Sequence, residues 1–208
     1  MNRQVCFLSL LSAAAAHGAT VHFNVNTNTG SEAMLYSVTV HDNTPNLLTF
    51  AVAVADSSPN NGDIVGFYMN FGVANANTGY GLSDFSGSAI TKLQLNSSNV
   101  QGGGLGQAFQ FGLGIGSVGA AANFYDSFTF TMNLKNGLTL ADLDLIGVRA
   151  MSVSPDATWA NPGEGSSKTF VERGDDPVPT PVVPLPTGAG LAGLGLLVMG
   201  ARRRRSLL

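Results

Sequence analysis

The sequence contains little cysteine and little charge. Its single cysteine is Cys6, and charged residues make up 11% of the 208 residues, which is less than half of their usual share in globular proteins. A fold held together by disulfides is excluded, because such a scaffold needs several cysteines in its folded part. The length allows one folded domain with a substantial hydrophobic core, but not two large ones.

Basic residues are scarce in the middle of the chain. All 13 acidic residues lie between Glu32 and Asp176. Of the ten basic residues, one is Arg3 and four occupy positions 202–205, which leaves five in the middle. A nucleic-acid-binding domain needs a stripe of Lys and Arg in its folded part. The acidic middle therefore excludes a basic nucleic-acid binder.

Residues 1–18 contain the parts of a secretory signal peptide in the usual order. Arg3 gives a positive start, residues 5–16 form a run of apolar and small residues, and further small residues follow. We expect the Sec translocon to export the chain and signal peptidase to cut after Gly18, with a cut after Ala16 as the alternative. A short buried helix is the competing interpretation of the same residues.

The C-terminal part combines a proline-rich linker, an apolar segment and a cluster of positive charges. Five prolines lie between positions 177 and 186, so residues 175–183 are expected to form a stiff, extended linker. Residues 185–201 carry no charge and, at 17 residues, reach the lower limit for a transmembrane helix. The arginines that follow are expected to stay in the cytoplasm, which places the middle of the chain outside the inner membrane.

The same C-terminal residues resemble a known sorting signal. A short proline-containing motif comes first, formed by Val183, Pro184, Leu185, Pro186, Thr187. The apolar segment follows it, and the chain then reaches the cluster Arg202, Arg203, Arg204, Arg205. This pattern over residues 184–205 resembles the VPLPA-CTERM variant of the PEP-CTERM sorting signals of Gram-negative bacteria, with Thr187 in place of the usual alanine. The resemblance implies cleavage by an exosortase near the motif, followed by release or transfer to the cell surface. It also implies an association with exopolysaccharide and biofilm.

Residues 19–174 show the period-two alternation of β-strands. Apolar side chains alternate with polar or small ones in several runs, among them Leu48, Phe50, Val52, Val54, and Phe128, Phe130, Met132, Leu134. Turn residues at 43–46 and 57–62 separate such runs. We expect about nine short strands in an all-β, antiparallel β-sandwich of the jelly-roll-like kind. The glycine-rich stretches 102–106 and 112–119 are predicted to be a flexible loop and the end of a strand.

One loop has the composition of a calcium site. Asp56, Asn61 and Asp63 place two carboxylates and an amide in eight residues, and Ca²⁺ prefers such oxygen ligands from loops. The segment does not match the twelve-residue pattern of an EF-hand loop. A solvated acidic turn without a metal is the alternative, so calcium is a hypothesis and no other cofactor is expected.

Three further patterns support weaker hypotheses. Residues 114–119 fit the G-x-G-x-x-G pattern of dinucleotide-binding loops, but a strand is expected to follow rather than the required helix, so a glycine-rich turn is favoured. His22 and His41 would form a metal site only if the fold brought them together. Trp159 lies in a polar stretch and is the best candidate for an exposed aromatic residue that could stack on a sugar.

Together these patterns predict an exported, non-catalytic protein of the cell surface or extracellular matrix. It would be anchored in the inner membrane until an exosortase cleaves it. A carbohydrate- or calcium-binding module is the first alternative, which an exposed aromatic row or clustered loop carboxylates would favour. A secreted hydrolase is the second, and it would need a cleft with convergent histidine or carboxyl groups.

Overall fold

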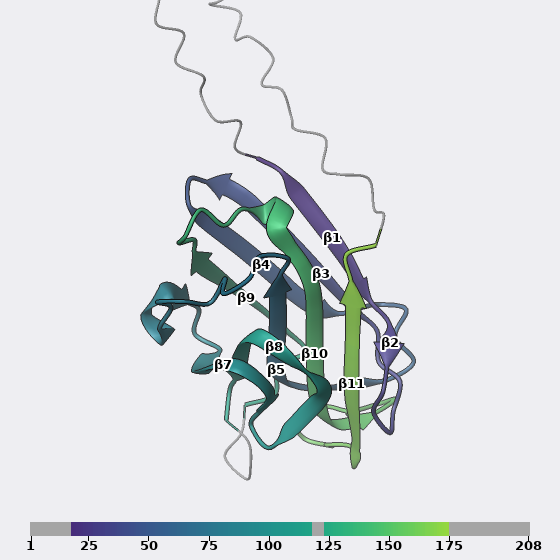
Figure 1. Cartoon of the computed structure of the whole chain (residues 1–208). Coiled ribbons are helices and arrows are strands. Elements are labelled where there is room, and N and C mark those ends of the chain that lie inside the picture. The colour runs from purple at the N-terminus through teal and green to yellow at the C-terminus, as the bar shows by residue number, and fades with distance from the viewer. Residues whose placement is uncertain (1–17, 118–122, 175–208) are drawn as a thin grey trace, which may run out of the picture. The chain divides into compact units, whose positions relative to one another are not determined.

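The alternating apolar residues form strands that assemble into two antiparallel sheets (Figure 1). The computed structural model describes residues 18–117 and 123–174, which belong to the compact unit Gly18–Thr180. In sheet A the strands follow the order β1 (Thr20–Val25), β3 (Tyr36–Thr44), β4 (Leu47–Val54), β9 (Ser127–Asn133) and β6 (Phe85–Ser86).

Sheet B contains the longer strands. Their order is β2 (Thr27–Asn28), β11 (Gly165–Glu172), β10 (Leu143–Ser154), β5 (Asn61–Phe71), β8 (Gly103–Ile115) and β7 (Ile90–Val100). Two short 3₁₀ turns, η1 (Leu82–Asp84) and η2 (Leu140–Asp142), precede β6 and β10. No α-helix occurs in residues 18–117 and 123–174.

Aromatic rings join the inner faces of the two sheets. Phe50 and Phe130 are directly paired in sheet A and stack at 4.5 Å between ring centroids. Phe67 of sheet B meets both rings edge-on, at 5.8 and 5.3 Å. Such edge-to-face contacts are favoured by the charge distribution of aromatic rings. The prediction of an all-β antiparallel sandwich is thereby confirmed in its general form.

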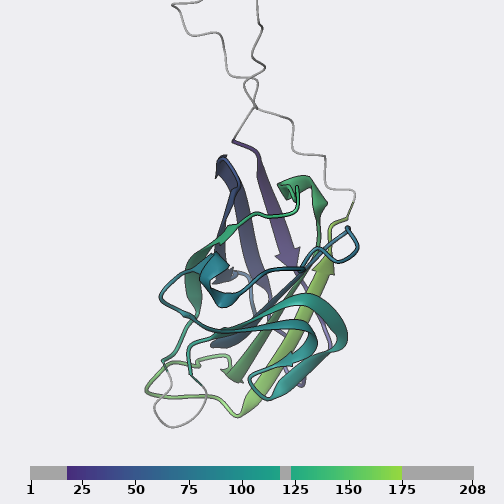
Figure 2. The ribbon, with the colours of Figure 1, turned by 60° about the vertical axis from the view of Figure 1, so that its left-hand side comes forward.

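The β7–β8 hairpin extends beyond the sheet and folds back over its outer face. Figures 1 and 2 show it lying across the green strands of sheet B. Its far half forms a second, smaller core there, in which Leu105 and Phe109 are buried together with Tyr68 and Leu145. Gly147 lies beneath this core, and a Cβ at position 147 would collide with Leu105. The glycine therefore makes the close approach of the hairpin possible.

The glycine-rich stretches differ from the prediction. Residues 103–115 form one continuous strand of 13 residues rather than a flexible loop followed by a strand end. The reason is that Gly112 and Gly114 face the folded-back part of the hairpin: a Cβ at these positions would meet Val100 and Gln101. Glycine here is selected by close packing on the sheet, not by freedom of the backbone. Residues 118 and 119 of the G-x-G-x-x-G pattern lie outside the described residues.

The predicted signal peptide, linker and sorting signal lie outside the described residues, apart from Gly18 itself. Within the described part of the chain, no helix is long and apolar enough to cross a membrane.

Candidate functional site

The residues of the calcium hypothesis lie where the chain leaves sheet A and enters β5. Asp56 is exposed in the turn after β4. Asn61 is engaged by its surroundings: its Nδ2 donates to the carbonyl of Ala157 at 3.0 Å, and its Oδ1 accepts from the amide of Gly62 at 2.9 Å. Among the residues that the structure describes, no three His, Cys, Asp or Glu side chains gather in a metal-binding group. Calcium binding by Asp56, Asn61 and Asp63 stays a prediction.

Asp63 carries the more deeply buried of the two carboxyl groups in the calcium hypothesis. Only 8% of its surface is exposed, and its Oδ1 accepts a hydrogen bond from the amide of Tyr125 at 2.9 Å. Burial raises the pKa of Asp63 to about 6, although the hydrogen bond from Tyr125 opposes this effect. The carboxyl group therefore tethers the segment before β9 to sheet B, and it carries a proton at mildly acidic pH.

A shallow cleft of about 340 Å³ opens beside these residues. It lies between the β4–β5 turn, the start of β9 and the loop that follows β10. Its lining includes the polar side chains of Ser58, Asn60, Asn61, Asp126 and Ser127. Neutral sugars are bound through such amide, carboxylate and hydroxyl groups, which pair with their hydroxyls.

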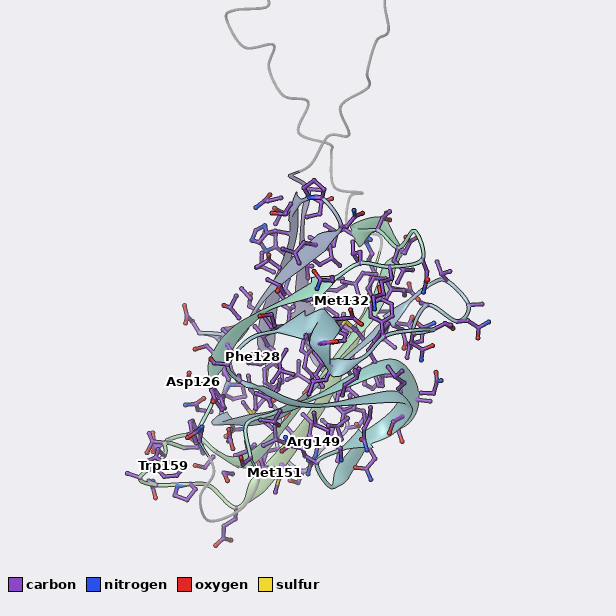
Figure 3. All side chains as sticks on the ribbon, turned by 90° about the vertical axis from the view of Figure 1, so that its left-hand side faces the viewer. Asp126, Phe128, Met132, Arg149, Met151 and Trp159 are labelled. Atoms are coloured by element: carbon purple, nitrogen blue, oxygen red, sulfur yellow. The ribbon has the colours of Figure 1, made fainter. Side chains whose placement is uncertain are left out.

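Trp159 is presented by an anchored loop at the same end of the molecule (Figure 3). Its side chain is 62% exposed, the largest fraction among the exposed large hydrophobic residues of the described chain. Thr158 and Asn161 close the turn around it through two backbone hydrogen bonds of 3.1 and 3.3 Å. The loop is held at its base by Ala157, which is buried. This arrangement agrees with the prediction that Trp159 is the exposed aromatic residue.

His22 and His41, the two histidines that the structure describes, lie on the outer face of sheet A. Thr20 pairs with His41 and His22 pairs with Thr39 in the register of β1 and β3, so the two rings are diagonal neighbours. The Nδ1 atom of His41 lies 2.8 Å from the hydroxyl of Thr20, and that of His22 lies 2.9 Å from the hydroxyl of Thr39. The register thus places the two histidines at diagonal positions, and each ring has a threonine hydroxyl as its hydrogen-bond partner.

The sorting motif from Val183 to Thr187 and the arginines at 202–205 lie outside the described residues. Comparison of the chain with protein-family models, curated proteins and solved structures finds no match.

Sequence reasoning missed two residues, Asp126 and Arg149. Asp126 lines the cleft because β9 pairs with β4, a contact between segments far apart in the chain. Arg149 is 6% exposed although it carries a charge. The sequence held one signal for Arg149. It lies in the predicted strand at 145–153, where residues 147, 149 and 151 share one face, so a charged residue stands on the same face of the sheet as Gly147 and Met151.

Proposed function

We propose that this chain is an exported, non-catalytic protein that an exosortase sorts to the cell surface or the extracellular matrix. One observation supports the proposal: the described strands begin at Thr20 and end at Glu172. The sheets therefore lie between the expected signal-peptide cleavage after Gly18 and the expected linker at 175–183. Cleavage after the signal peptide and at the sorting motif would therefore release the β-sandwich intact. We also propose that the strands of the sandwich are connected in the jelly-roll-like manner expected from the sequence.

The test is expression of the full chain in a host that has its own exosortase and in a strain that lacks it. The intact mass of the product and its cellular fraction are measured in both. We expect loss of the residues beyond about 186 and release from the inner membrane only where the exosortase is present. A Pro184→Ala/Pro186→Ala variant should stay uncut, while Pro177→Ala/Pro179→Ala in the linker should be processed normally. A tail that remains uncut in both strains would overturn the proposal.

A carbohydrate-binding module is the second candidate, because Trp159 and the polar cleft lie at one end of the sandwich. An exposed indole ring offers a flat apolar surface for a sugar ring, and the cleft offers hydroxyl partners. This second candidate function includes the proposed calcium site of Asp56, Asn61 and Asp63, which lie beside the cleft.

Affinity electrophoresis of the full chain in gels that contain neutral polysaccharides tests this second candidate. We expect Trp159→Ala to abolish retardation. Leu82→Ala is the matched control, since Leu82 is also exposed, at 44%, but belongs to η1. Equal retardation of the wild type and the Trp159 variant would remove Trp159 from the candidate site.

A further inference from the structure

Two positive charges lie side by side on the outer face of sheet B. Arg149 of β10 and Lys168 of β11 occupy directly opposite positions in the antiparallel register. Like charges in such positions repel each other and destabilise a sheet. Neither has a carboxylate partner: in residues 18–117 and 123–174, the salt bridge between Lys135 and Asp84 is the only one. The pair therefore has no counter-charge of its own.

Arg149 is buried beneath the tip of the β7–β8 hairpin (Figure 3). Its Nη1 donates to the carbonyl of Gln101 at 3.0 Å, while its Nε has no hydrogen-bond partner. Gly103 lies so close that a Cβ there would collide with the guanidinium group. Burial lowers the pKa of Arg149. A buried cation without an anion is unfavourable, so a negative charge near it would be stabilised.

A groove of about 400 Å³ lies between the hairpin and β11, and of the two cations Lys168 lines it while Arg149 does not. Lys168 and Gln107 line it, together with Leu105, Phe170 and the main chain of Gly104 and Gly106. The Nε2 group of Gln107 is a buried donor without a partner. No carboxylate lines the groove. It thus combines the ammonium group of Lys168 with an apolar floor, and the unpaired amide donor of Gln107 is buried in its wall, where a turn of the side chain would bring it to a ligand.

We propose that this groove binds the carboxylate of an acidic polysaccharide, with Lys168 pairing with the carboxylate and Phe170 lying beneath the sugar ring. A sugar ring needs an apolar surface for its C–H faces, and the uronate carboxylate needs cationic or N–H donors. The choice of a polysaccharide as the ligand rests on the proposed matrix function. The location of the site rests on the lining of the groove.

The charge of the whole domain favours one localised contact over a broad one. The described residues contain five Lys and Arg against 11 Asp and Glu, so a polyanion is repelled over most of the surface. Nucleic acids are held by many phosphate contacts at once, and this groove exposes a single ammonium group, that of Lys168. A saccharide with spaced carboxylates fits the groove better than a nucleic acid.

Binding of oligogalacturonate to the full chain in mild detergent tests the proposal, with dextran fragments of equal length as the neutral probe. We expect calorimetry to show binding of oligogalacturonate only. Lys168→Gln should weaken it about tenfold, the typical worth of one charge-assisted hydrogen bond. Gln107→Leu should weaken it several-fold. Lys92→Gln is the matched control: it removes the same charge from another strand of sheet B, outside the groove, and should change the affinity less than about twofold.

Three results would overturn the proposal. They are equal binding of dextran and oligogalacturonate, an equal loss of affinity in the Lys92 and Lys168 variants, and equally tight binding of a single-stranded oligonucleotide. Thermal unfolding of each variant shows whether a lost affinity reflects lost structure. The binding measurement is independent of exosortase processing. A chain that is sorted but does not bind oligogalacturonate would refute only the proposal of a binding groove. A chain that binds but is not cut refutes only the sorting.

Discussion

The backbone amide of Val100 donates a hydrogen bond to Tyr68 Oη at 3.0 Å. The same hydroxyl donates in turn to the carbonyl of Gly103 at 3.2 Å, so one side chain of β5 holds both strands of the folded-back hairpin. Tyr68 and Val100 are fully buried, so the hydroxyl group and the amide of Val100 are shielded from water, while the carbonyl of Gly103 is partly exposed. The position of the hairpin over sheet B, and with it the proposed groove, therefore depends on this hydroxyl.

Replacing Tyr68 with Phe should destabilise the protein by about 1–3 kcal/mol, because the buried amide of Val100 loses its acceptor. Urea unfolding measures the loss, and hydrogen exchange at Val100 should speed up. Tyr125→Phe is the matched control. Among the described residues, the hydroxyl of Tyr125 accepts a single bond, from Asn123 in an exposed segment, so removing it should cost less than about 0.5 kcal/mol. Equal stabilities of the two variants would contradict the prediction.

Replacing Gly147 with Ala should destabilise the protein by about 1–3 kcal/mol through overpacking against Leu105. The control is Gly72→Ala, where an added Cβ has no neighbour closer than 3.9 Å. If the contact is the cause, adding Leu105→Ala to the Gly147 variant should cost less than the two single changes together. Strict additivity in the double variant would rule out the contact as the cause.

Stability should fall as the pH rises through the titration of Asp63. The pKa of this carboxyl is raised from 3.8 to about 6 in the folded protein. The folded state therefore binds the proton more tightly than the unfolded state, and the resulting stabilisation is present in full below pH 3.8 and lost as the pH rises through about 6. The loss should amount to about 1–3 kcal/mol.

Asp63→Asn tests this dependence, because the amide oxygen still accepts from Tyr125 but does not titrate. The variant should be more stable than the wild type at pH 7 and should lack its decline between pH 4 and 7. Asp126→Asn, at an exposed carboxylate, should keep the wild-type decline. Urea unfolding across this pH range gives the comparison, and parallel curves for the wild type and the Asp63 variant would contradict the assignment.

The ion pair between Lys135 and Asp84 should show the opposite pH dependence. Lys135 Nζ lies 2.6 Å from Asp84 Oδ2, and this hydrogen bond, with that from the amide of Gly81, lowers the pKa of Asp84. Its stabilisation is therefore present above the usual aspartate range and lost as the pH falls. Asp84→Asn should cost about 0.5–1 kcal/mol at pH 7. The difference from the wild type should shrink in acid, and a constant difference down to pH 2 would contradict the prediction.

The four longer strands of sheet A, β1, β3, β4 and β9, could be predicted from the sequence because their pattern is local, whereas the two-residue strand β6 could not. Phe50 and Val52 face the core and Ala51 faces outward, as period-two alternation requires. The path of the β7–β8 hairpin could not be predicted. In the sequence, the glycines at 112 and 114 look like turn residues, because the folded-back segment that covers them is not apparent. That segment is held in place by contacts with Tyr68 and Gly147, which belong to other strands.

The candidate sites divide in the same way. Trp159 could be selected from the polar character of its own neighbourhood. The cleft and the groove could not be predicted. Asp126 and Asn60 line one cleft, and Lys168 and Gln107 line one groove, only because distant segments of the chain have come together. The neighbouring positions of His22 and His41 likewise follow from the register of β1 and β3, which the two separate strand patterns leave open.

The contact between Gly147 and Leu105 also limits how this sequence can drift. A side chain gained at position 147 removes the space that Leu105 occupies. In a lineage that acquires a larger residue at 147, a smaller residue at 105 would therefore restore part of the lost stability. The two positions are expected to change together during evolution, although they belong to different strands and lie far apart in the chain.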